Sequence, residues 1–98
     1  MDFKIIWSDA AIEDLRSILS YIAKQDPQAA IRMGDGILSH TQILQSFPFI
    51  GPNYPRGVKG SLREIVFRNY RIFYDVSEDT KTVEILHVWH GARQEPSL

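Results

Sequence analysis

Three short apolar runs follow one another closely in the second half of the chain, and they constrain the fold more than any other feature. The runs are Leu62–Phe67, Tyr70–Val76 and Thr82–Trp89, and all three are rich in β-branched and aromatic residues. Only Arg68-Asn69 separates the first two runs, and Ser77 to Lys81 separate the second from the third. Links this short join neighbouring strands that run in opposite directions, so the sequence predicts an antiparallel meander.

The first half of the chain has a different periodicity. Phe3–Trp7 is a short strand-like run, and Ser8 follows it as a candidate N-cap. Apolar residues then recur at helical spacing in two segments, at Ala11, Ile12, Leu15, Ile18, Leu19 and Ile22, and at Ala30, Met33, Ile37, Ile43 and Leu44. Asp26-Pro27 separates the segments, and proline suits the first position of a helix. The short link predicts an antiparallel helical hairpin, in which Gly34 and Gly36 either admit the first helix closely or weaken the second.

The predicted order is therefore strand, helix, helix, strand, strand, strand, within a single domain of 98 residues. Prolines and glycines predict a loop over residues 47–60, and Gln94–Leu98 has the composition of a flexible tail. We expect an α+β fold in which the helical hairpin packs on one face of a small antiparallel sheet. The opposite face of the sheet is expected to stay open to a partner or a substrate.

Charge and composition narrow the functional classes. The formal net charge of -1 argues against a general nucleic-acid binder, but five cations and one anion between Arg56 and Arg71 give a local excess of +4. Such a polarised surface suits an acidic or anionic partner. The absence of cysteine excludes a disulfide framework and thiolate metal sites. With no apolar stretch long enough to cross a bilayer and no signal-peptide pattern, we expect a cytoplasmic protein without membrane contact.

Three short motifs fall on or after the predicted strands of the second half. Leu62-Arg63 opens the first of these strands, Tyr70-Arg71-Ile72-Phe73-Tyr74 lies in the next, and His90-Gly91-Ala92-Arg93 ends the last. In this order, and in so short a chain, the motifs resemble the RelE/ParE toxin superfamily of bacterial type II toxin–antitoxin modules. The resemblance implies a toxin that a cognate antitoxin binds and neutralises. RelE-like members cut mRNA on the ribosome, whereas ParE-like members inhibit DNA gyrase.

The residues favour one branch of the superfamily. RelE-like toxins use lysine and arginine side chains on the sheet and a tyrosine near the C-terminus. Arg71 matches the sheet arginine, but Leu62–Phe67 contains no lysine and Gln94–Leu98 contains no tyrosine. ParE-like sequences end their sheet with histidine, glycine and arginine, as here. We therefore expect a ParE-like gyrase inhibitor, without catalytic residues or a cofactor, that binds a ParD-like antitoxin. In the alternative, a ribosome-dependent mRNA endoribonuclease would use Arg71, His90 and Arg93.

Target contacts are expected from Arg63, Arg71, His90 and Arg93. A two-residue turn at Arg68-Asn69 would put Arg63 and Arg71 on opposite faces of the sheet, whereas a three-residue turn would put them on the same face. Tyr70, Ile72, Tyr74 and Val76 suit the core, which leaves Arg71 on the open face. Glu64 would repel a phosphate if it faced the same way.

His87 and His90 have a spacing that metal sites sometimes show. Residues three apart on a strand point to opposite faces, and no cysteine or acid cluster lies nearby, so we expect no metal. His87 is expected to be a half-buried structural residue. Trp7 and Trp89 are expected in the core or at its rim, or else as anchors for an antitoxin helix in a groove whose residues the sequence does not identify.

Overall fold

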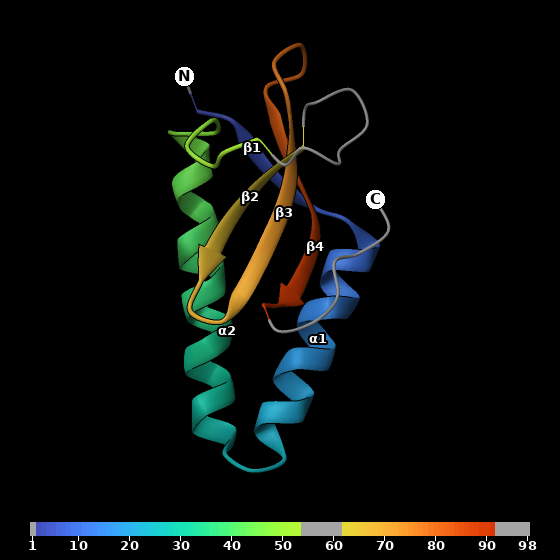
Figure 1. Ribbon diagram of the computed structural model, residues 1–98, viewed down its shortest axis with the longest axis vertical. Coiled ribbons are helices and arrows are strands. Elements are labelled where there is room, and N and C mark those ends of the chain that lie inside the picture. The colour runs from blue at the N-terminus through green and yellow to red at the C-terminus, as the bar shows by residue number, and fades with distance from the viewer. Residues whose placement is uncertain (1, 54–61, 92–98) are drawn as a thin grey trace.

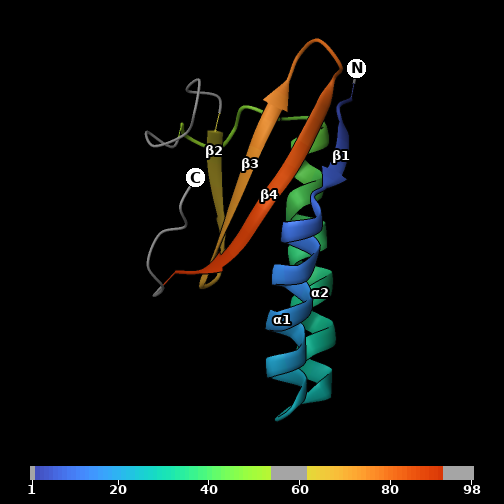
Figure 2. The same cartoon turned by 90° about the vertical axis from the view of Figure 1, so that its right-hand side faces the viewer.

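The computed structural model of the chain describes residues 2–53 and 62–91. Its elements follow the predicted order: β1 (Lys4–Trp7), α1 (Asp9–Ala23), α2 (Pro27–Gln42), a 3₁₀ turn η1 (Ile43–Gln45), β2 (Leu62–Phe67), β3 (Tyr70–Ser77) and β4 (Thr82–His90) (Figure 1). The α+β fold is confirmed, with the two helices side by side on one face of the sheet (Figure 2). The predicted tail at Gln94–Leu98 and part of the predicted loop lie outside the described residues.

The four strands lie in the order β1-β4-β3-β2. β2, β3 and β4 form the predicted antiparallel meander. β1, however, pairs in parallel with β4, from Lys4 opposite Thr82 to Trp7 opposite Ile85. The sheet is therefore mixed, and the expectation of a purely antiparallel sheet was wrong for its first strand. The whole helical hairpin intervenes between β1 and the meander, and a connection of that length lets two strands run in the same direction.

Short polar side chains cap the start of both helices, and for Ser8 this confirms the prediction. Ser8 Oγ accepts a hydrogen bond from the Ala11 amide at 3.0 Å, and Asp26 Oδ1 accepts one from the Ala29 amide at 3.1 Å. These bonds satisfy amides that have no partner inside the helix. Within residues 2–53 and 62–91, neither helix is long and apolar enough to span a membrane.

The two glycines of α2 have different neighbours. A Cβ at Gly34 would lie 3.2 Å from Leu19 of α1, so this glycine does admit the first helix closely. A Cβ at Gly36 would lie 2.5 Å from the Phe67 ring, so this one admits the sheet instead. Ile43 was expected in the buried stripe, but it is exposed. α2 ends at Gln42, and the tighter 3₁₀ turn that follows changes the direction of the next side chains.

The main core lies between the helical hairpin and the inner face of the sheet. β3 contributes alternate residues to it as expected, and its other buried members include Ile37, Leu44, Val83, Ile85 and Val88. The outer face carries a second apolar cluster, in which Phe73 and Leu62 are buried beside Leu86 and Trp89. The expectation of an open outer face was therefore wrong for this part of the sheet. β2, β3 and β4 carry large apolar side chains on the outer face as well as on the inner face, and burying apolar surface is favourable on either face.

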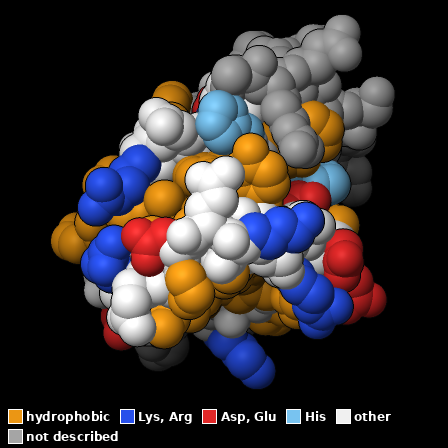
Figure 3. Space-filling model, turned by 90° about the horizontal axis from the view of Figure 1, so that it is seen from below, with side chains coloured by type: hydrophobic (Ala, Val, Ile, Leu, Met, Phe, Trp, Pro, Cys, Tyr) orange, Lys and Arg blue, Asp and Glu red, His pale blue; other side chains and the backbone are white. Residues whose placement is uncertain are grey.

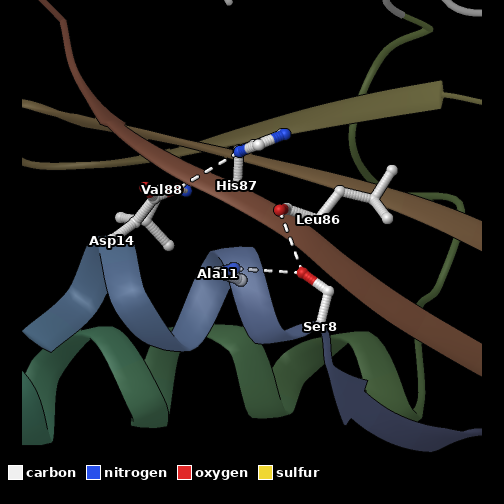
Figure 4. Close-up of polar contacts among 6 residues, drawn as sticks. All are labelled: Ser8, Ala11, Asp14, Leu86, His87 and Val88. Carbon is white, nitrogen blue, oxygen red and sulfur yellow. Dashed lines mark hydrogen bonds and ion pairs between the residues drawn. The ribbon is translucent and has the colours of Figure 1, made fainter.

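The N-terminal half of α1 lies along the edge of β4 beyond the point where β1 ends, and forms hydrogen bonds with it (Figure 4). β1 stops at Trp7, and polar groups from the next residues continue the hydrogen bonding along the strand. Ser8 donates its amide to the Ile85 carbonyl at 2.9 Å and its hydroxyl to the Leu86 carbonyl at 3.0 Å. Six residues further along, Asp14 Oδ2 accepts a hydrogen bond from the Val88 amide at 3.0 Å. These bonds fix α1 against the second half of β4, the half that leads to His90.

Candidate functional site

A hollow of about 420 Å³ lies where the β2–β3 turn meets the end of β4. Three of its lining residues are polar or basic side chains of the turn and of β3, and the full set is Val66, Arg68, Asn69, Arg71, His90 and Gly91. The Gly91 amide donates a hydrogen bond of 2.6 Å to the Asn69 carbonyl, which ties the end of β4 to the turn. The hollow therefore joins residues from three strands, and its size is near the lower end of ligand-binding pockets.

The β2–β3 connection is the two-residue turn, Arg68-Asn69. Phe67 pairs with Tyr70 on either side of it, and Arg68 has a φ of 53°. Positive φ at the first central residue is characteristic of the hairpin turns that match strand twist. The register that follows pairs Arg63 with Tyr74 and Val66 with Arg71. Arg63 and Arg71 therefore lie on opposite faces of the sheet, which resolves the alternative that turn length had left open.

Arg71 lies on the outer face and is held by a carboxylate. Its Nε is 2.5 Å from Glu64 Oε2, and its second terminal nitrogen is 3.4 Å from Glu64 Oε1. The guanidinium also lies over the Phe73 ring, 5.1 Å from its centre. Such a two-point contact fixes both the position and the orientation of the arginine. Glu64 does face the same way as Arg71, so an incoming phosphate would meet a negative charge beside the positive one.

His90 contributes to the hollow from the last position of β4. It is half-buried, and its ring meets the Tyr70 ring edge-on at 5.4 Å. His87 is oriented differently: its Nδ1 lies 3.3 Å from Asp14 Oδ2, on the edge that α1 closes (Figure 4). The two histidines therefore do not converge. Among the residues that the structure describes, no three His, Cys, Asp or Glu side chains gather as a metal site would require.

Arg63 has a different neighbourhood from the other predicted target residues. It donates hydrogen bonds to the Gly51 carbonyl at 2.6 Å and to the Phe49 carbonyl at 3.3 Å, and it lies over the Phe49 ring. The same loop is held by Tyr74, whose buried hydroxyl accepts a hydrogen bond of 3.0 Å from the Gly51 amide. Burial raises the pKa of Tyr74, while the Gly51 hydrogen bond and the Arg63 charge lower it to a smaller extent. Arg63 thus fastens the loop that follows α2.

The structure therefore brings two of the four predicted target residues together. Arg71 and His90 line one hollow, Arg63 lies apart, and Arg93 is outside the described residues. Arg68 and Asn69 were missed as site residues, because the sequence suggested only that they form a turn. The local excess of cations in this segment was the available signal. Seen from below, hydrophobic side chains lie at the surface among Lys and Arg side chains (Figure 3).

Comparison with known proteins identifies what this architecture is similar to. Residues 5–95 match the family described as ParE toxin of type II toxin–antitoxin system, parDE. Y4kP of Sinorhizobium fredii (strain NBRC 101917 / NGR234), a protein named as a candidate toxin, is 37% identical over 97 residues, which cover 97% of this chain and 95% of Y4kP.

Solved structures of low sequence identity share the fold. A chain of the chromosomal ParDE toxin–antitoxin system from P. aeruginosa superposes with a TM-score of 0.75 at 20% identity, covering 90% of this chain and 95% of that one. A chain of the archaeal RelE–RelB complex from Pyrococcus horikoshii OT3 superposes with a TM-score of 0.65 at 21% identity, covering 96% and 100%. The β-α-α-β-β-β arrangement is thus common to ParE-like and RelE-like proteins.

Proposed function

Because the chain belongs to the ParE toxin family of type II toxin–antitoxin systems, we propose that it inhibits DNA gyrase by binding it and that a cognate, ParD-like antitoxin neutralises it. Both partners are expected in the cytoplasm, where the free toxin would arrest growth. The solved relatives include toxins described together with their antitoxins, which supports an antitoxin partner here.

The observation that carries the proposal is the pairing of Arg71, which lines the candidate site, with Glu64 on the neighbouring strand. Cutting RNA without a metal needs cations that stabilise the charge developing on the phosphate, together with a general acid and a general base. Here the sheet arginine is already held by a carboxylate at 2.5 Å. The preceding strand offers Arg63, which faces the other side, and no lysine. The site suits recognition of an acidic protein surface better than attack on a phosphate.

The first experiment measures supercoiling by purified DNA gyrase in the presence of the full chain. We expect inhibition by the wild type, and at least a tenfold loss of potency in Arg68→Ala and in His90→Ala, since both side chains line the hollow. Arg16→Ala is the matched control, because this arginine lies on α1 in an exposed pair with Glu13. Supercoiling that persists at every toxin concentration would contradict the proposal.

One observation favours a second candidate function. Arg71 and His90 line the same hollow, and the His90 ring contacts Tyr70, so a guanidinium and an imidazole border one site. A RelE-like endoribonuclease would use these two residues with Arg93. In a translation extract it would cut mRNA on the ribosome, His90→Ala would abolish cutting, and gyrase would be unaffected. Intact mRNA in such an extract would exclude this alternative.

Growth measurements test the module as a whole. Expression of the chain alone should arrest growth with filamentation if gyrase is the target, and should stop translation abruptly if mRNA is the target. Co-expression with the product of the adjacent gene should restore growth in either case. Normal growth without that product would mean that the chain is not an active toxin.

A further inference from the structure

The side of α2 that faces away from the sheet carries two large aliphatic side chains in water. Ile31 is 58% exposed and Leu38 is 45% exposed. Gly36 and His40 of the same helix lie against the Phe67 ring of the sheet. Leu38 is two residues from each of them, or about 200° around the helix, so it points away from the sheet. In Figure 2 this side of the helical hairpin is the one that no strand covers.

The two aliphatic side chains belong to a stripe along α2. Spacings of four, three and four residues align them with two polar neighbours on one face of the helix. We call this set the outer stripe, and its members are Ile31, Asp35, Leu38 and Gln42. Ile31 and Leu38 lie seven residues apart, which is about two helical turns. Apolar residues at this spacing are those by which one helix packs against another, so the outer stripe suits contact with a second helix.

One cation and one anion lie in the middle of this face. Arg32 and Asp35 are both exposed, and within the described part of the chain neither forms an ion pair or a side-chain hydrogen bond. Together they add no net charge to the face. A partner that complements the face therefore needs apolar side chains opposite Ile31 and Leu38, and one charge of each sign between them.

We propose that a second copy of the chain covers this face, with the two α2 helices antiparallel across a two-fold axis beside Asp35. Ile31 and Leu38 lie equally far from that axis along the helix, so Ile31 of each copy packs against Leu38 of the other. Arg32 of each copy comes within one helical turn of the other copy's Asp35 and can form an ion pair with it. The outer stripe is thus complementary to itself, and a second copy necessarily carries the matching surface.

Charge selects the direction of the two helices. In a parallel arrangement Arg32 would face Arg32 and Asp35 would face Asp35, and like charges at such positions repel. The antiparallel arrangement replaces both repulsions with two equivalent ion pairs. Each pair is exposed and contributes little by itself, so the pairs determine direction more than strength.

The size of the hairpin limits the strength of the dimer. α2 has 16 residues, so it is about 24 Å long, and two helices side by side are about 20 Å wide. Two such faces bury about 1,000 Å² in total, at the low end for specific interfaces, and we expect a dissociation constant in the micromolar range. The hollow of Arg71 and His90 lies in the other layer, on the sheet, and stays free in this dimer. The inference therefore does not depend on which target the chain has.

The test is sedimentation equilibrium of the purified full chain from micromolar to millimolar concentration, in which we expect a monomer–dimer equilibrium. Ile31→Glu and Leu38→Glu bury a carboxylate in the contact and should raise the dissociation constant of the dimer at least tenfold. Tyr21→Glu is the matched control, because this side chain is 70% exposed on α1. It lies two residues from Leu19, which contacts Gly34 of α2, so it points away from α2. Its dissociation constant should stay within about twofold of the wild type.

An exchange of charges tests the arrangement of the helices. Asp35→Arg places two arginines together and should weaken the dimer severalfold. Adding Arg32→Asp re-forms the ion pair with its charges reversed, and should restore the dissociation constant to within about twofold of the wild type. A double variant that dimerises no better than Asp35→Arg would overturn the antiparallel contact.

Thermal melts of dilute samples separate loss of the dimer from loss of the fold. Ile31→Glu and Leu38→Glu change exposed positions, so both should melt as the monomeric wild type does. A wild-type chain that stays monomeric at millimolar concentration overturns the proposal. A dimer that both glutamate variants leave intact overturns it equally, because the contact would then lie elsewhere.

Discussion

Asp14→Ala should destabilise the fold through a single backbone amide. The carboxylate accepts one hydrogen bond from the Val88 amide at 3.0 Å and approaches His87 Nδ1 at 3.3 Å. Val88 is 2% exposed, so its amide has little access to water when the carboxylate is removed. The substitution therefore leaves a buried donor without an acceptor on the edge of β4.

The two contacts of Asp14 differ in expected magnitude. A buried donor that loses its partner costs about 1–3 kcal/mol of unfolding free energy. The contact with His87 is worth less, because both side chains are more than a quarter exposed, at 28% and 27%. Pairs of this kind contribute roughly 0–1 kcal/mol. We expect a loss of about 2 kcal/mol for Asp14→Ala, which in a domain of this size lowers the melting temperature by about 10 °C.

Urea denaturation of four variants checks the reasoning. Asp14→Asn keeps an oxygen that can accept from Val88, so it should lose about 1 kcal/mol or less. His87→Ala should also lose less than about 1 kcal/mol, and Glu13→Ala, in an exposed pair on the same helix, should be close to neutral. If His87→Ala proves as harmful as Asp14→Ala, the His87 contact and not the Val88 amide holds α1 to the edge of β4.

Further outcomes follow from the loop, the core and the site. Gly51→Ala should lower the unfolding free energy by about 1–3 kcal/mol, because its Cβ would lie 2.5 Å from the main-chain oxygen of Glu64. Gly34→Ala should change the unfolding free energy by less than about 1 kcal/mol, since alanine favours the helix and the flexible Leu19 side chain can move aside. The urea midpoints of the Gly51 and Gly34 variants test this difference. Burial raises the pKa of the Tyr74 hydroxyl in the folded state, so the unfolded state ionises first as pH rises past about 10. The free energy of unfolding should therefore fall above that pH. Thermal melts should show a smaller fall for Tyr74→Phe. Glu64→Gln should strengthen binding of single-stranded RNA severalfold at low salt, and the gain should be lost when Arg71→Ala is added. Fluorescence titrations that give the same RNA affinity for Glu64→Gln and the wild type would contradict the role assigned to this carboxylate.

Local patterns in the sequence were sufficient for most of the elements. β2 begins and ends where the apolar run predicted it, at Leu62 and Phe67, because alternation along a strand is a property of neighbouring residues. Ser8 begins α1 because its hydroxyl bonds to an amide three residues away. The direction of β1 depends instead on how the helical hairpin and the meander pack together. The four residues of β1, Lys4–Trp7, carry no pattern that predicts this. Ile43 departed from its stripe because the helix changed type at that residue.

The candidate site was harder to predict for a geometric reason. One residue more or less in the β2–β3 turn moves Arg63 from one face of the sheet to the other, and the sequence allowed both. Arg68, which lines the hollow, has a positive φ in the turn. This backbone conformation is uncommon for residues other than glycine, so an arginine in the sequence does not predict it. Arg71 was assigned to the outer face correctly from alternation alone. Its pairing with Glu64 follows from the register, in which Glu64 and Arg71 are diagonal neighbours on that face.

The parallel pairing of β1 with β4 has a consequence for the gene. β1 pairs with β4, which is synthesised much later, and the hydrogen bond between Ser8 and Leu86 spans 78 positions of the chain. A chain that is still being translated therefore cannot assemble its sheet in the order in which the residues emerge. A stop codon anywhere before Thr82 deletes β4, the strand that pairs with β1 in the described sheet. A genetic selection for survivors of the toxin should accordingly recover nonsense mutations as far along the gene as the codons just before Thr82.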